Sequence, residues 1–191
     1  MNEENRQHLL RIARESIQET LTEEPSATFA LIERNPPHEL QGAEGAFVTL
    51  KRKGISPGGD GALRGCIGNI LGQKPLYRLI QRLARESAFH DPRFQAVHLE
   101  ELAHLTIEIS VLTIPRPIES PEEIVVGTDG VLLTCGHHRA VFLPQVATEQ
   151  GWDRDTMLNH LAMKAGMYPT AWQQSECLFE VFQAEVFEED M

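Results

Sequence analysis

The chain has 191 residues, enough for one well-filled domain or for a domain with a small lobe added. Its 17 lysines and arginines against 28 aspartates and glutamates give a net charge of −11. Nucleic-acid binding depends on a basic surface that neutralises phosphates, so nucleic acid is not expected as a default partner. No apolar stretch reaches the roughly 18 residues of a membrane-spanning helix, so no membrane association is expected.

The N-terminus and the cysteines both indicate a cytoplasmic protein. The first residues lack the basic start and apolar stretch of a signal peptide. Cys66, Cys135 and Cys177 are odd in number and far apart, whereas disulfide frameworks of short secreted chains usually have an even count. We therefore expect three reduced thiols.

The first part of the chain predicts a helix and two paired strands. Apolar residues recur at three- and four-residue steps over residues 7–21, which is typical of a helix packed on a sheet. Residues 46–50 and 62–67 have strand patterns. The glycine-rich segment at residues 54–61 is expected to connect these two strands.

The middle of the chain predicts a second helix and a third strand. Pro75 suits the first turn of the helix. The apolar residues at helical spacing that would face the core are Leu76, Leu79, Ile80 and Leu83. A residue that precedes a proline disfavours helix, so Asp91-Pro92 should end this helix at or before His90. Residues 105–111 alternate apolar and polar, which predicts a half-buried strand.

The last part predicts two helices, a hairpin and a final strand. Residues 120–123 have capping-box spacing with proline at the first helical position. Apolar runs at 131–134 and 140–143, separated by a turn, predict a hairpin. Residues 153–166 suit a helix with an aspartate N-cap and a closing glycine. Residues 177–187 are expected to form one strand, with a phase change that a β-bulge would explain.

Helices and strands alternate irregularly, and the chain has no internal repeat. This order favours an α+β fold, mainly an antiparallel β-sheet flanked by helices, over a parallel doubly wound sheet. No segment has the composition of a linker between independent domains. We expect one domain over residues 1–191, with room for a smaller second lobe within it.

The segment LRGCIG at residues 63–68 is the first candidate for a functional site. Gly65 and Gly68 lie on either side of Cys66 and allow another group to approach the main chain closely. Arg64 could hold a carboxylate or phosphate, or favour the thiolate form of the cysteine. The alternative is that Cys66 is a small buried hydrophobe and that the glycines accommodate a crossing helix.

Two further segments supply candidate partners for Cys66. His90 is a candidate base, because nucleophilic cysteines usually rely on a nearby imidazole. Asp91 could orient His90 or pair with an arginine. The alternative is that Asp91 caps a turn and Arg93 makes a structural ion pair. Glu108 is an acid–base candidate if burial raises its pKa. If its face of the strand is exposed to solvent, Glu108 is an ordinary polar strand residue.

The run Cys135-Gly136-His137-His138 contains metal-ligating residue types. Structural zinc sites normally pair two spaced couples of ligands, whereas this cluster stands alone at the tip of a predicted hairpin. We expect no metal and no cofactor. The sequence has no P-loop, GxGxxG, HExxH or GxSxG motif.

The segment LRGCIG belongs to a series of motifs that runs from about residue 47 to residue 187. The other members are AFVTL at 46–50, DPRF at 91–94, EL at 101–102, IEISVL at 107–112, GTDGV at 127–131, LPQVA at 143–147, EQGWD at 149–153 and KAG at 164–166. In this order the series resembles the AMMECR family, the domain called protein A in bacterial AmmeMemoRadiSam systems.

The resemblance implies an α+β domain built on an antiparallel sheet with a smaller lobe. It also implies partners, because family members are encoded beside a Memo-like protein and a radical S-adenosylmethionine enzyme. It assigns no activity. The positions that match the family's motif residues are Arg64, Cys66, Asp91, Arg93 and Glu108. His90 and the histidines at 137 and 138 lie outside the pattern.

We therefore expect an enzyme, or a component of an enzyme system with the Memo-like and radical S-adenosylmethionine proteins, that acts on a small molecule or nucleobase. Cys66 would be the reactive thiol and Arg64 the clamp for an anion. The catalytic candidates are Cys66, Arg64, Asp91 and Glu108, and the ligand-binding candidates are Gly65, Gly68 and Arg93. The alternative is a non-catalytic module that binds a partner or ligand through the same segment.

Overall fold

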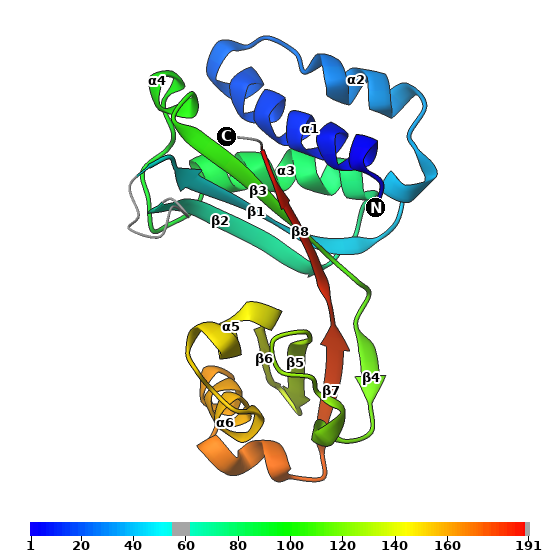
Figure 1. Cartoon of the computed structure of the whole chain (residues 1–191), viewed down its shortest axis with the longest axis vertical. Helices are drawn as coiled ribbons and strands as arrows, with labels where there is room; N and C mark the ends of the chain where they lie inside the picture. Colours follow the sequence, from blue (N-terminus) through cyan, green and yellow to red (C-terminus); the bar gives the residue numbers. More distant parts are fainter. Residues whose placement is uncertain (55–61, 190–191) are drawn as a thin grey trace. The chain divides into compact units, whose positions relative to one another are not determined.

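The computed structural model describes residues 1–54 and 62–189, so the expected connection at 54–61 lies, except for Gly54, outside the described residues. The chain divides into two compact units. One is formed by Met1–Val111 and Glu185–Met191, the other by Leu112–Ala184 (Figure 1). Both combine helices with a four-stranded sheet, which confirms the predicted α+β class. Among the described residues, no helix has the length and hydrophobicity needed to cross a bilayer.

The first unit is built on a sheet with the strand order β2-β1-β3-β8. Its strands are β1 (Glu44–Arg52), β2 (Ala62–Leu71), β3 (Leu105–Leu112) and β8 (Ala184–Glu188). β1 and β2 are antiparallel, with Thr49 directly opposite Cys66. β2 is therefore an edge strand, and among the described residues one side of its main chain has no strand neighbour.

Helices cover one face of this sheet (Figure 1). They are α1 (Glu3–Thr22), α2 (Ala27–Arg34), α3 (Leu76–Phe89) and α4 (Leu99–Leu102), with a 3-10 helix at His38–Leu40. Apolar residues of α1, α3, β1 and β3 share one core. The helix expected after Pro75 is confirmed: Pro75 is its N-cap, His90 its C-cap, and its predicted apolar stripe is buried.

The second unit has a sheet with the order β4-β7-β5-β6. Its strands are β4 (Arg116–Ile118), β5 (Gly130–Cys135), β6 (His138–Phe142) and β7 (Cys177–Phe182), and its helices are α5 (Pro144–Glu149), α6 (Arg154–Lys164), and the 3-10 helices η2 (Pro121–Glu123) and η3 (Pro169–Gln173). The predicted hairpin is confirmed as β5–β6, and the capping box is present at Ser120. Asp153 caps α6 as expected, because its side chain accepts a hydrogen bond from Thr156 N.

Two expectations about strands are wrong. Residues 177–187 form two strands, β7 and β8, which belong to different sheets, so the phase change marks a change of sheet and not a bulge. β3 is not half-buried, because it lies inside the sheet between β1 and β8 and only Glu108 is partly exposed.

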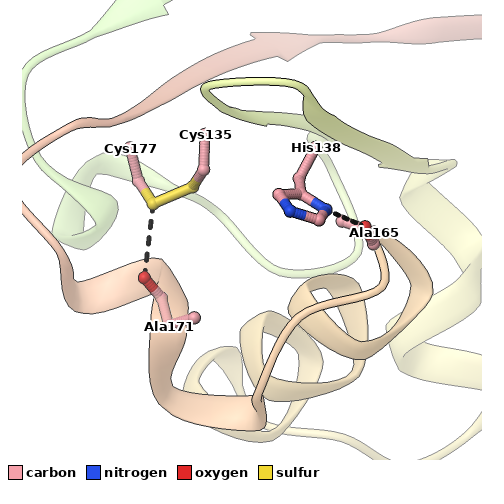
Figure 2. Close-up of a disulfide and its surroundings, with 5 residues drawn as sticks. All are labelled: Cys135, His138, Ala165, Ala171 and Cys177. Atoms are coloured by element: carbon pink, nitrogen blue, oxygen red, sulfur yellow. Dashed lines mark hydrogen bonds between the residues drawn. A yellow bond between two sulfur atoms is a disulfide. The ribbon is translucent and has the colours of Figure 1, made fainter.

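The expectation of three reduced thiols is wrong for Cys135 and Cys177, which form a disulfide (Figure 2). The two residues are 42 positions apart in sequence but directly opposite each other on β5 and β7. Their Cα atoms are 4.3 Å apart, just below the roughly 4.4–6.8 Å usual for disulfides. The spacing of the cysteines in the sequence does not show that these two strands pair in this register. Cys66 is a free thiol, as expected.

Gly65 allows α3 to pack directly against β2. A Cβ atom at this position would clash with the main-chain oxygen of Ser87 in α3. The Ser87 hydroxyl also accepts a hydrogen bond from Ile67 N at 2.8 Å and donates one to Val48 O at 2.6 Å. The hydroxyl thus bridges β1 and β2, and the bridge requires a residue without a side chain at position 65.

Gly65→Ala is expected to lower the free energy of unfolding by about 1–3 kcal/mol, because overpacking displaces the α3 main chain from β2. Gly42→Ala is the control, since the atoms nearest its Cβ belong to the carboxylate end of the Glu44 side chain, which can rotate away. Denaturant unfolding followed by circular dichroism measures both. Equal midpoints for the two variants would contradict the close packing at Gly65.

Candidate functional site

The sulfur of Cys66 lies on the sheet face that is turned away from the helical core. Cys66 is half-buried on β2, and the Thr49 hydroxyl of β1 donates a hydrogen bond to its Sγ at 3.4 Å. Val48 and Leu50, on either side of Thr49, are fully buried in the core. Because successive strand residues alternate between faces, Thr49 and Cys66 project from the opposite face.

Asp91 and Arg93 hold the main chain of Cys66 at the open edge of β2. Asp91 Oδ2 accepts a hydrogen bond from Cys66 N at 2.9 Å, and Arg93 Nη2 donates one to Cys66 O at 3.2 Å. The same guanidinium donates to both carboxylate oxygens, from Nε to Oδ1 at 2.9 Å and from Nη2 to Oδ2 at 2.7 Å. The pair therefore takes the place of a neighbouring strand at this residue.

The charge of this pair is fixed by its surroundings. The Arg93 guanidinium holds the pKa of Asp91 far below its ordinary value, despite the opposing effect of burial, and Cys66 N assists. The side chain of Asp91 is 1% exposed. The pKa of Arg93 is raised, chiefly by its bond to Asp91 and in smaller part by the charge of Cys66. Asp91 is thus a permanent carboxylate that positions other groups and cannot deliver a proton near neutral pH.

Arg64 binds a carboxylate of the protein itself. It is 5% exposed, and its Nε and Nη2 donate to the two carboxylate oxygens of Glu101 at 2.6 and 2.9 Å. Arg52 binds the same carboxylate at 3.0 Å. Arg64 Nη1 is buried and has no hydrogen-bond partner among the described residues. The bidentate fork that was expected to clamp a ligand anion is therefore occupied by Glu101.

The Phe94 ring lies between two guanidinium groups. The central carbon of Arg64 is 5.9 Å from the ring centroid, and that of Arg93 is 5.4 Å from it. Arg93 is half-exposed, whereas Arg64 is buried. This cation–π arrangement links the Arg64–Glu101 pair to the Asp91–Arg93 pair that holds Cys66.

Glu108 forms an ion pair with Lys51 on the same sheet face as Cys66. Lys51 Nζ is 2.7 Å from Glu108 Oε2, and both side chains are about four-fifths buried (23% and 20% exposed). Lys51 follows Thr49 by two residues on β1, so both point to that face. β1 separates β3 from β2, which places Glu108 across one strand from Cys66.

The remaining candidates have other neighbours. His90 is exposed at the end of α3, where its Nδ1 lies 3.7 Å from Glu86, and Asp91 pairs with Arg93 and not with His90. At Gly68 a Cβ atom would clash with the Phe47 ring, so the absent side chain accommodates that ring. Within residues 1–54 and 62–189, no group of three metal-ligating side chains is placed to hold a metal ion.

The comparisons with known proteins agree with this arrangement of motifs. The AMMECR1 family model matches residues 10–187. The chain belongs to the AMMECR1 family. The resemblance inferred from LRGCIG and its companion motifs is therefore confirmed. Protein PF1979 of Pyrococcus furiosus is 41% identical over 189 residues, which cover 95% of this chain and 87% of the relative.

Two further AMMECR1 relatives extend the comparison. A protein of Thermococcus gammatolerans is 41% identical over 192 residues, covering 95% of this chain and 89% of the relative. The crystal structure of uncharacterized protein PH0010 from Pyrococcus horikoshii superposes with a TM-score of 0.78 at 40% identity, covering 95% of this chain and 90% of that one. The family fold thus extends over both units of this AMMECR1 chain.

Three residues of the candidate site were not singled out from the sequence. They are Thr49, which donates to the Cys66 sulfur, Lys51, which pairs with Glu108, and Glu101, which holds Arg64. Thr49 and Glu101 do fall inside the motifs AFVTL and EL. Their places in these motifs could have identified Thr49 and Glu101 as candidate site residues from the sequence.

Asp91→Asn is expected to lower the free energy of unfolding at pH 7 by about 1–3 kcal/mol, because Arg93 loses its charged partner. Folding depresses the pKa of Asp91, so its stabilisation is present above the ordinary value of 3.8 and is lost as pH falls below it. The difference between wild type and variant should therefore shrink below about pH 4 in unfolding measurements.

Asp155→Asn is the matched control, because Asp155 is exposed and lies 3.6 Å from Arg154. Its effect should stay within about 0.5 kcal/mol at every pH. If Asp91→Asn lowers the free energy of unfolding equally little, or if its effect grows at acid pH, the Asp91–Arg93 ion pair does not stabilise the fold as described.

Proposed function

We propose that this chain acts on a small molecule or nucleobase at the Cys66 segment, as an enzyme or as a component of an enzyme system with Memo-like and radical S-adenosylmethionine proteins. One observation carries the proposal: Cys66 is only partly buried, and its sulfur accepts a hydrogen bond from the Thr49 hydroxyl. A thiol enclosed by aliphatic groups would have no such donor. A hydrogen-bond donor at sulfur supports negative charge there, and the charged thiolate is the nucleophilic form.

The surrounding residues divide into three roles in this proposal. Cys66 is the group that contacts the substrate, and Thr49 is the donor at its sulfur. Asp91 and Arg93 are positioning residues, because they fix the main chain on both sides of the thiol. Polar parts of a substrate on this face would meet the ion pair of Lys51 and Glu108. Arg64 acts at a distance by holding Glu101 against β2.

A second candidate function is a non-catalytic binding module. It is favoured by the fact that the carboxylate of Asp91 and the fork of Arg64 are both engaged within the chain. The turn that carries Arg93 and Phe94 would then bind a partner or ligand. Arg93 is half-exposed and Phe94 is partly exposed beside it, so both are accessible for such contacts.

Alkylation with iodoacetamide tests the reactive thiol. In the unreduced, folded protein we expect one label per chain, at Cys66, and no label in Cys66→Ser, because the other cysteines form the disulfide. Thr49→Val should slow labelling at pH 7 by several-fold, whereas Thr49→Ser, which keeps the hydroxyl, should not. Labelling that occurs only after urea unfolding would overturn the proposal.

Partner capture separates the two functions. Purified Memo-like and radical S-adenosylmethionine proteins serve as the captured proteins, and their affinity for this chain is measured by titration. If the chain is enzymatic, Cys66→Ala should leave capture unchanged while turnover in the reconstituted system is lost. If it is a binding module, Phe94→Ala should weaken capture about tenfold or more and no turnover should depend on Cys66. Ala96→Ser is the matched surface control, because Ala96 is exposed on the same turn.

A further inference from the structure

Three side chains form a row across the sheet of the second unit, which does not contain the proposed site. Cys177 of β7 lies opposite Cys135 of β5, and Cys135 lies opposite His138 of β6. Residues opposite each other on neighbouring strands project from the same face. In Figure 2 the sulfur atoms and the imidazole point toward the segment that carries Ala165 and Ala171. His138 Nδ1 is held there by Ala165 O at 2.8 Å.

The disulfide joins two strands at the spacing they would have without it. The Cα atoms of Cys135 and Cys177 are 4.3 Å apart, close to the roughly 4.5 Å of a non-hydrogen-bonded antiparallel pair. Cys177 N donates to Gln174 O at 3.0 Å, as expected when it does not bond to the opposite strand. Two thiols would therefore fit on the same backbone, and breaking the S–S bond does not require the sheet to open.

The surroundings of Cys177 also suit the reduced state. The main-chain oxygen of Ala171, in η3, lies 3.3 Å from Cys177 Sγ (Figure 2). A disulfide sulfur has no hydrogen to donate to this carbonyl, but a thiol at the same place has one. The reduced cysteine thus has a hydrogen-bond acceptor already in position.

The two cysteine residues differ in how deeply they are buried. Cys135 is 3% exposed and belongs to the core of the second unit. Cys177 is half-buried and lies at the margin of that core. An incoming thiolate must reach the sulfur that it attacks, so access selects Cys177.

We propose that Cys135–Cys177 is a thiol–disulfide exchange site for dithiols, with Cys177 as the attacked sulfur. A thiolate of the dithiol bonds to Cys177 Sγ, the Cys135–Cys177 bond breaks, and Cys135 leaves as a thiolate that takes up a proton. The second thiolate of the same dithiol then attacks its partner sulfur in the mixed disulfide and releases Cys177. The chain gains two electrons and two protons, and the dithiol is oxidised to its cyclic disulfide. This site is independent of the function proposed for Cys66.

The first experiment uses the full chain with Cys66→Ser, which removes the free thiol. The protein is equilibrated in mixtures of reduced and oxidised dithiothreitol, and thiols are trapped and counted by mass spectrometry. We expect a reversible conversion between disulfide and dithiol, with circular dichroism and cooperative thermal unfolding retained in the dithiol. A disulfide that resists millimolar dithiothreitol until the protein unfolds, or a dithiol without cooperative unfolding, would overturn the proposal.

The second experiment identifies the attacked sulfur. In the Cys66→Ser background, Cys135→Ser leaves Cys177 and Cys177→Ser leaves Cys135. The thiol of Cys177 should react with dithiodipyridine about tenfold faster or more than that of Cys135. If either variant fails to fold, acid quenching of the intact chain during reduction replaces this comparison, and peptide mapping should locate the mixed disulfide on Cys177. Equal reactivity, or a mixed disulfide on Cys135, refutes the assignment.

Discussion

The carboxylate of Asp91 connects the parts of the first unit that surround the candidate site. It lies just after α3, yet it bonds to the main chain of β2 and to Arg93, which bonds to the same residue of β2. An edge strand has unpaired N–H and C=O groups, and here the Asp91–Arg93 ion pair satisfies them at Cys66. The orientation of the Cys66 side chain therefore depends on a carboxylate 25 residues further along the chain.

Most of the LRGCIG segment is explained by packing. Arg64 holds Glu101, Gly65 admits the main chain of α3, and the main-chain N–H of Ile67 bonds to the Ser87 hydroxyl. These contacts come from two helices, α3 and α4, and they hold three of the six residues of the segment. The sulfur of Cys66 differs from them, because its hydrogen bond comes from a side chain on the partly exposed face. A rigid strand that presents one thiol is an arrangement suited to chemistry, and it would serve equally to hold a contact surface in place.

The sequence predicted what depends on local pattern and missed what depends on register. Helix α3 follows from its apolar spacing and from the prolines at positions 75 and 92, which act on neighbouring residues only. The Cys135–Cys177 bond and the assignment of β8 to the first sheet depend on which strands pair, and no local pattern encodes that choice. The same holds for the Arg64–Glu101 pair, whose partners are separated by 37 residues. The motifs along the chain thus named the candidate residues, while the partners of these residues came only from the fold.

The two sulfur environments of this chain favour opposite chemistry. At Cys66 a hydroxyl donates a hydrogen bond to the sulfur, which supports negative charge and hence nucleophilic attack by the thiol. At Cys177 a carbonyl oxygen lies 3.3 Å from the sulfur, where it repels negative charge and can bond only to a protonated sulfur. Cys177 is therefore suited to be attacked while oxidised and to rest as a neutral thiol once reduced. Because a donor contacts one sulfur and an acceptor contacts the other, a single chain can hold a reactive thiol at Cys66 and an exchangeable disulfide at Cys177 as two separate sites.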